Sequence, residues 1–177
     1  MSEASSNLAR YDGVQEGTSA GAMSSSLSAF RAQFMGSEVK RRILMGTYTL
    51  SAGYADAYYE RACEVRELVS AELNSKLLLY DALLTPVSTS IAPKLSTSLD
   101  NPLDMYTGDA MTVNVNLSGL PALVVRGNNV SNSGVSLPVG VQLIGRAFDE
   151  TKLLTIGSIY ERASYEKFEL QQFAAKV

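Results

Sequence analysis

The segment that decides the fold reads EVKRRILMGTYTLSAGYADAYY and runs from Glu38 to Tyr59. It passes from charged residues into an apolar run, and Ser37 just before it suits a helix N-cap, so we expect a helix over about residues 37–51. A second helix is expected over about residues 53–79, because apolar side chains recur at helical spacing and form one continuous face. That face consists of Tyr58, Ala62, Val65, Val69 and Leu73.

Short apolar runs further along the chain, bounded by turn-forming residues, predict three strands. They cover about residues 81–86, 122–126 and 137–144. Residues 128–134 have the composition of a hairpin loop, so the last two strands are expected to pair antiparallel. Strands interspersed with helices predict a layered α/β fold.

Three further helices are expected. A short one covers about residues 27–34, within a loop-rich N-terminal region whose residues 18–26 form a Ser/Gly/Ala patch. Another covers about residues 103–117. The last opens at Asp149 and Glu150, whose charges suit a helix N-terminus. Its apolar side consists of Leu153, Leu154, Ile156 and Tyr160.

Composition limits the classes of function. Of the 177 residues, 46% are hydrophobic, which is enough for the core of one domain or of part of one. The net charge of −3 gives no electrostatic case for direct nucleic-acid binding. No apolar run approaches the roughly 18 residues needed to span a bilayer, and the N-terminus shows no pattern of a signal or transit peptide. One cysteine and no histidine leave no internal disulfide, no imidazole base and no imidazole metal ligand.

The residues by themselves do not describe a self-sufficient catalyst. Nucleophilic catalysis needs an activated side chain beside a base, together with an oxyanion site. The chain has no histidine to serve as that base, and no glycine-rich phosphate loop or metal-ligand spacing is present. Cys63 falls within the second expected helix with no histidine to activate it, so we interpret it as a small helix residue.

Five blocks of sequence, in the same order, resemble the C-terminal half of the A subunits of glutamyl-tRNA(Gln) amidotransferases, which are amidase-signature enzymes. The resemblance implies an α/β fold that is the C-terminal portion of the amidase-signature fold, with a mixed β-sheet flanked by helices. Residues 1–177 would form the C-terminal part of a single domain, loop-rich over residues 1–36, with helices and core strands over residues 37–177. The blocks are residues 3–13, 39–59, 104–123, 137–145 and 148–154.

The resemblance also implies a substrate site without a nucleophile. The family's Ser–Ser–Lys triad lies in segments that this chain lacks, so we assign it no catalytic residue and expect the chain alone to be inactive. The family's arginine for the α-carboxylate of glutamine corresponds to Arg42, and its aspartate for the α-amino group corresponds to Asp109. A planar guanidinium is the natural bidentate partner of a carboxylate, and charges at both ends of an amino acid would orient its amide. Without the resemblance, both would be interpreted as ordinary solvated charges.

Four other polar residues in the resembling blocks are interpreted as supporting ones. Ser5 and Ser6 are expected to line or support the pocket rather than to attack the substrate. Asn114 and Asn116 are expected to hydrogen-bond nearby backbone, with a simple capping role as the alternative. No residue is assigned to a metal.

The family's activity defines the partners that the resemblance implies. The A subunit hydrolyses glutamine to release ammonia, the B subunit uses ATP and Mg²⁺ to activate glutamate on tRNA(Gln), and a small C subunit wraps both. The chain would thus be part of a ligase complex of protein biosynthesis, binding no cofactor itself and contacting Glu-tRNA(Gln) mainly through the B subunit, with no membrane partner. Its compartment would be the bacterial cytoplasm, the plastid stroma or the mitochondrial matrix. Its sequence is most similar to the plastid and cyanobacterial members of the family.

Two other interpretations stay open. One is a fragment of another amidase-signature hydrolase that acts on an amide other than an amino acid. The other is a non-catalytic remnant that only docks partner subunits. The motif Asp104-Met-Tyr-x-x-Asp109 favours an amino-acid substrate over the first of these.

Overall fold

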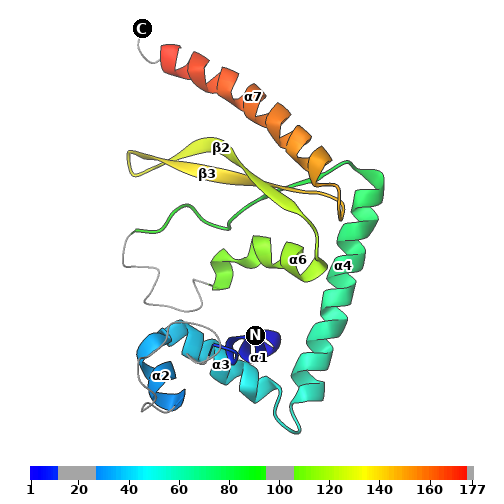
Figure 1. Ribbon diagram of the computed structural model, residues 1–177. Coiled ribbons are helices and arrows are strands. Elements are labelled where there is room, and N and C mark those ends of the chain that lie inside the picture. Colours follow the sequence, from blue (N-terminus) through cyan, green and yellow to red (C-terminus); the bar gives the residue numbers. More distant parts are fainter. Residues whose placement is uncertain (12–26, 95–105, 175–177) are drawn as a thin grey trace. The chain divides into compact units, whose positions relative to one another are not determined.

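The computed structural model describes residues 1–11, 27–94 and 106–174 (Figure 1). The chain divides into two compact units, Met1–Val65 and Arg66–Val177. The assignment of the whole chain to one domain stays a prediction. The patch at residues 18–26, expected to be a loop, lies outside the described residues.

The first unit is helical in its described part. It contains α1 (Ser2–Leu8), α2 (Leu27–Phe34), α3 (Ser37–Thr49), the π-helical turn η1 (Asp56–Glu60) and the first residues of α4 (Arg61–Leu79). The helices expected over residues 27–34 and 37–51 are confirmed, the second ending two residues early. Helix α1 was not expected, because its serine-rich sequence has weak helix propensity.

Two expectations for α3 and α4 are wrong. Ser37 is the first residue of α3 rather than its N-cap, a position that Gly36 takes with extended backbone (φ −65°, ψ 163°). The predicted apolar face of the second helix is only partly buried: the π turn before α4 shifts Tyr58 relative to the residues of α4, of which Leu73 packs against the core. Tyr58 and Val65 are each 50% exposed, whereas Leu77 in the last turns of α4 is buried.

Helices α1 and α3 approach each other closely at Gly46, which is buried. A Cβ atom at Gly46 would lie 2.5 Å from Ser5 Cβ and 2.6 Å from the Met1 carbonyl oxygen. The hydroxyl groups of Ser2 and Thr49 are 2.7 Å apart and join the same two helices. Only glycine at this position allows the two backbones to come so near.

The second unit is built on a three-stranded antiparallel sheet in the order β1-β3-β2. Its strands are β1 (Leu83–Pro86), β2 (Ala122–Asn132) and β3 (Val135–Ile144). All three predicted strands and the antiparallel pairing of the last two are confirmed. The described residues thus have the expected α/β character, and the pairings among them are all antiparallel.

The hairpin between β2 and β3 differs from the expected loop. Most of residues 128–134 belong to β2, which pairs with β3 up to the contact of Asn132 with Val135. The turn consists of Ser133 and Gly134, both with positive φ (52° and 80°), as in the two-residue turns that match strand twist. The polar residues that predicted a loop therefore form the end of strand β2 as well as the turn.

Helices cover both faces of this sheet, as Figure 1 shows for α6 and α7 on opposite sides of the β2–β3 ribbon. Adjacent residues of a strand point to opposite faces, so Leu143 and Ile144 enter different cores. Leu143 packs with Val125 and with Leu153 of α7 (Glu150–Ala174). Ile144 packs with three buried residues of α4, α6 (Ala110–Ser118) and the turn after α6, namely Leu77, Val115 and Leu120.

Two predicted helices of this unit are refined by the structure. Within residues 103–117, the described part is helical at 106–108, breaks at Asp109 and resumes as α6. The last helix begins at Glu150 as expected, and Leu153, Ile156 and Tyr160 lie against the sheet. Leu154 was wrongly placed on that side; it is 60% exposed, because it lies one position, or about 100°, around the helix from Leu153.

The carboxyl end of α4 is held by Arg146, which follows β3. Its Nε donates to the Leu77 carbonyl at 2.7 Å and its Nη2 to the Tyr80 carbonyl at 3.4 Å. Beside it, Lys152 donates to the Asp81 carboxylate. The hydrogen bond and charge of Lys152, with a smaller contribution from Arg146, lower the pKa of Asp81 below its ordinary 3.8.

We expect Gly46→Ala to destabilise the protein by about 1–3 kcal/mol, because the added methyl group would overlap Ser5 and the Met1 carbonyl. Thermal unfolding measures the effect. Gly36→Ala is the control, since a Cβ atom there meets nothing within 4 Å. Equal melting temperatures for the two variants would contradict the close approach of α1 and α3.

The Asp81–Lys152 pair predicts a dependence of stability on pH. Because the folded-state pKa of Asp81 is lowered, its contribution is present above pH 3.8 and is lost as the pH falls through the folded-state value. A double-mutant cycle with Asp81→Asn and Lys152→Met should give a small coupling at neutral pH that vanishes in strong acid and in high salt. A coupling that persists in acid would rule out an ionic pair.

Candidate substrate site

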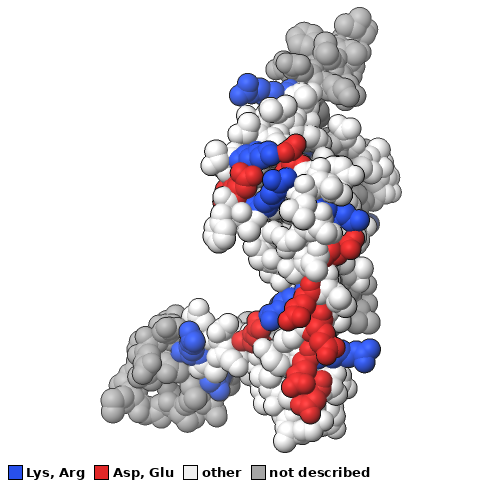
Figure 2. Space-filling view, turned by 90° about the vertical axis from the view of Figure 1, so that its right-hand side faces the viewer, with Lys and Arg blue, Asp and Glu red and all other residues white. Residues whose placement is uncertain are grey.

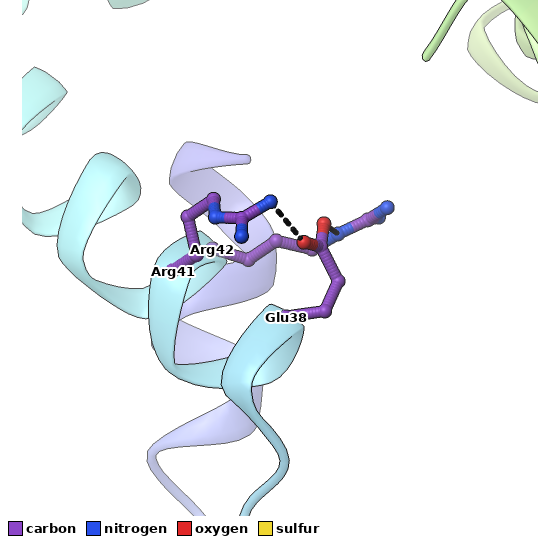
Figure 3. Close-up of polar contacts among 3 residues, drawn as sticks. All are labelled: Glu38, Arg41 and Arg42. Atoms are coloured by element: carbon purple, nitrogen blue, oxygen red, sulfur yellow. Dashed lines mark hydrogen bonds and ion pairs between the residues drawn. The ribbon is translucent and has the colours of Figure 1, made fainter. Parts of the chain in front are cut away.

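Arg42 lies on α3 in the first unit, where Glu38 holds it. Arg42 Nε donates to Glu38 Oε1, and Arg41 Nη1 donates to Glu38 Oε2, both at 2.9 Å. Figure 3 shows the two guanidinium groups approaching this carboxylate from opposite sides. The Arg42 side chain is 38% exposed. Glu38 thus contacts the Arg42 guanidinium at its Nε edge.

Asp109 lies at the N-terminus of α6 in the second unit. Its carbonyl oxygen accepts hydrogen bonds from the amides of Thr112 and Val113, both at 3.0 Å, and from Thr112 Oγ1 at 3.1 Å. Its exposed carboxylate makes no capping bond to the helix. The backbone thus closes the first turn of α6, while the carboxylate is not used for capping and faces solvent.

A groove of about 870 Å³ begins next to Asp109 in the second unit. Its mostly apolar walls are formed by β1, the segment after β1, Gly108 and residues 138–141 of β3. Thr89 Oγ1 donates to the Thr107 carbonyl at 3.2 Å and ties the segment after β1 to the chain leading into α6. Asp109 therefore directly follows a residue, Gly108, that lines this groove.

The far end of α6 is fixed by its own cap. Gly119 has a left-handed conformation (φ 66°, ψ 28°), and the Leu120 amide donates to the Val115 carbonyl at 3.3 Å. Leu120 and Val115 are both buried in the core under β3. This is the pattern of a Schellman cap, in which a glycine turn and a hydrophobic contact end a helix together.

Sequence reasoning missed Gln142, a buried polar residue of β3 that is only 2% exposed. Its Nε2 donates to Thr85 Oγ1 on β1 and to the Met111 carbonyl on α6, both at 3.1 Å. The available signal was a lone amide side chain within the apolar strand Pro138–Ile144. Such a residue is costly to bury unless it is hydrogen-bonded, so it marks a polar contact inside the core.

The supporting residues have local roles. Ser5 is buried and its Oγ donates to the Ser2 carbonyl at 2.8 Å, so it serves the packing of α1. Asn114 Nδ2 donates to the Ala110 carbonyl at 3.4 Å within α6, as a bond to nearby backbone. Cys63 lies on α4 near Tyr59, where the thiol and then Glu3 raise the pKa of the tyrosine hydroxyl.

The structure leaves the pairing of the two predicted substrate residues as a prediction, since Arg42 and Asp109 belong to different units. Among the side chains that the structure describes, in residues 1–11, 31–94 and 106–164, no group of three acidic or cysteine residues is arranged to hold a metal ion. Over the same ranges, no helix combines the length and apolar character needed to cross a bilayer.

Comparison with known proteins identifies the class first: residues 1–154 match the Amidase family, and the chain belongs to it. Among its relatives is the A subunit of the chloroplastic/mitochondrial glutamyl-tRNA(Gln) amidotransferase of Oryza sativa subsp. japonica, 52% identical over 163 residues, which are 91% of this chain and 30% of the rice protein. The corresponding A subunit of Synechococcus sp. (strain CC9902) is 48% identical over 92% of this chain and 33% of its own length.

A solved structure supports the same relationship. The crystal structure of the glutamyl-tRNA(Gln) amidotransferase A subunit from Thermotoga maritima superposes with a TM-score of 0.52 at 44% identity. The match covers 72% of this chain and 27% of the Thermotoga chain. The resemblance to these A subunits is thus confirmed, and the chain spans about a third of the length of the curated relatives it matches.

We expect Gly119→Ala to destabilise the second unit by about 1 kcal/mol, because an L-residue in the left-handed region is strained. Chemical denaturation measures the change. Gly108→Ala is the matched control, since it has no positive φ and its added Cβ meets nothing within 4 Å. A loss of stability no larger than that of the control would argue against the cap.

Proposed function

We propose that this chain is part of the glutaminase subunit of a glutamyl-tRNA(Gln) amidotransferase, a ligase complex that converts Glu-tRNA(Gln) to Gln-tRNA(Gln). The observation that carries the proposal is the 52% identity over 91% of the chain to a protein named as that subunit. The match to the Amidase family covers residues 1–154, which include α3 with Arg42 and Asp109 at the start of α6.

In this proposal the chain contributes to binding glutamine rather than to cutting it. Arg42 would hold the α-carboxylate through the outer edge of its guanidinium, with Glu38 fixing the inner edge. Asp109 would hold the α-ammonium, and its carboxylate suits this role because it is exposed and makes no bond to its own helix. Binding at two charged points leaves the side-chain amide in one orientation.

The nucleophile and its activating groups would come from the remaining part of the subunit, so the chain by itself is proposed to be inactive. Attack on the glutamine amide would release ammonia, which leaves for the tRNA-bound glutamate. ATP and Mg²⁺ are assigned to the B subunit, and a C subunit completes the complex. No cofactor is assigned to this chain.

The negative charge of the chain supports the proposal that a partner subunit makes most of the contacts with tRNA. On the face shown in Figure 2, acidic side chains form a column along η1 and the start of α4. In this part of the chain, the acidic residues Asp56, Glu60 and Glu64 recur at intervals of four residues. Acidic surfaces repel phosphate backbones, so this face would not lie against tRNA. The working place would be the plastid stroma, the mitochondrial matrix or the bacterial cytoplasm, as the relatives' names suggest.

The test measures glutamine hydrolysis by the complete enzyme that contains this chain. Asp109→Asn and Arg42→Lys should each lower kcat/KM for glutamine by about 10- to 100-fold. The first removes a charge-assisted contact, and the second keeps the charge but replaces a bidentate pair of hydrogen bonds by a single one. The loss for Asp109→Asn should disappear with glutaramate, which is glutamine without its α-amino group.

Arg41→Lys is the matched control, because Arg41 shares Glu38 with Arg42 but has no assigned contact with substrate. It should retain nearly full activity. An unchanged kcat/KM for glutamine in Asp109→Asn would point to a hydrolase of a different amide. A complete complex without any glutaminase activity would indicate a remnant that only docks its partners.

A further inference from the structure

Gln142 connects three elements of the second unit through one buried amide. It lies on the central strand β3, and its Nε2 reaches Thr85 on β1 and the Met111 carbonyl on α6, each at 3.1 Å. With only 2% of the residue exposed, water cannot replace these two bonds. The amide is thus a built-in attachment point between the sheet and α6.

The orientation of this amide follows from its partners. A backbone carbonyl can only accept a hydrogen bond, so the group that faces Met111 has to be the NH₂ of Gln142. The Thr85 hydroxyl then accepts the second proton of the same NH₂ group. Both donors of the amide are therefore used in holding α6 to β1 and β3.

The attachment lies at the end of α6 that carries Asp109. Met111 is two residues beyond Asp109 and within the turn that Asp109 closes through the amides of Thr112 and Val113. Because this turn is a closed hydrogen-bonded ring, a shift of the Met111 carbonyl would shift the Asp109 backbone with it. The opposite end of α6 is held separately, by Gly119 and the buried Leu120.

We propose that Gln142 is a positioning residue for Asp109: its amide fixes the first turn of α6, and so the place of the carboxylate that receives the substrate's α-ammonium group. The proposal rests on the function proposed above, and extends it to a residue that would not itself touch the substrate. Loss of the amide would loosen the Asp109 end of α6 while the core at its other end stays packed.

The test compares two substrates in the complete enzyme. Gln142→Met keeps the length and volume of the side chain but removes both donors. We expect kcat/KM for glutamine to fall about three- to tenfold, mainly through KM, while kcat/KM for glutaramate stays unchanged. A purely structural role would lower activity toward both substrates to the same extent.

Two further variants keep the test decisive. Thr85→Val removes only the β1 partner and leaves the bond to Met111, so its preference for glutamine over glutaramate should stay near that of the unmodified enzyme. Gln142→Asn shortens the side chain and withdraws the NH₂ from Met111, so it should reproduce the selective loss if the methionine variant does not fold.

Asp109→Asn, measured in the same way, separates the two proposals. If it loses activity toward glutamine selectively and the folded Gln142 variant does not, the positioning role is overturned and the glutamine-binding function stands. If Asp109→Asn itself shows no selective loss, the assignment of Asp109 fails and the role of Gln142 fails with it. Selective loss in both supports the positioning role.

Discussion

The second unit depends on one constraint: a polar amide is buried in the middle of an apolar sheet, and it has to be hydrogen-bonded there. Gln142 meets this requirement only while β1 and the first turn of α6 both lie within bonding distance. An unsatisfied buried amide costs about 1–3 kcal/mol, so an arrangement that separates these elements is penalised. Hydrophobic contacts alone would tolerate small slips of α6, because they have no direction. The hydrogen bond of the Gln142 amide fixes the position of the N-terminal end of α6.

Around this amide, the alternation of β3 divides the apolar residues between two cores. Leu143 joins α7 on one face, and Ile144 joins α4 and α6 on the other. Arg146 follows at once and binds the carbonyl groups at the end of α4, so the strand and the helix end at the same place. A few consecutive residues of β3 thereby hold together most of the elements of the unit. The candidate site uses that rigidity, since Asp109 lies on the helix that the strand holds.

Short apolar runs bounded by turn-forming residues were enough to predict all three strands, and the helices α2 and α3 were also predicted from the sequence. Such patterns failed where tertiary contact outweighs local preference. Helix α1 has a serine-rich sequence that is typical of loops, yet the close packing of Ser5 on Gly46 orders it. The hairpin arm around residue 130 has turn-forming composition, but pairing with β3 extends it. Of the candidate site, the resemblance supplied Arg42 and Asp109. Glu38 lies four residues before Arg42 on one helix, a spacing that the sequence shows, but it was not singled out. The contacts of Gln142 could not be predicted, because hydrogen bonds across elements leave no periodic trace.

The two charged side chains proposed to bind the substrate are oriented in different ways, and the difference follows from their chemistry. A guanidinium has several donors, so Glu38 can hold one edge of Arg42 without using up the edge that a carboxylate would need. A carboxylate has only two oxygens, and holding Asp109 by its own side chain would compete directly with an ammonium group. Its orientation therefore has to come from the backbone, through the closed turn of α6 and the amide of Gln142 beneath it. The arginine is oriented by a neighbour on its own helix, and the aspartate by the strand below it.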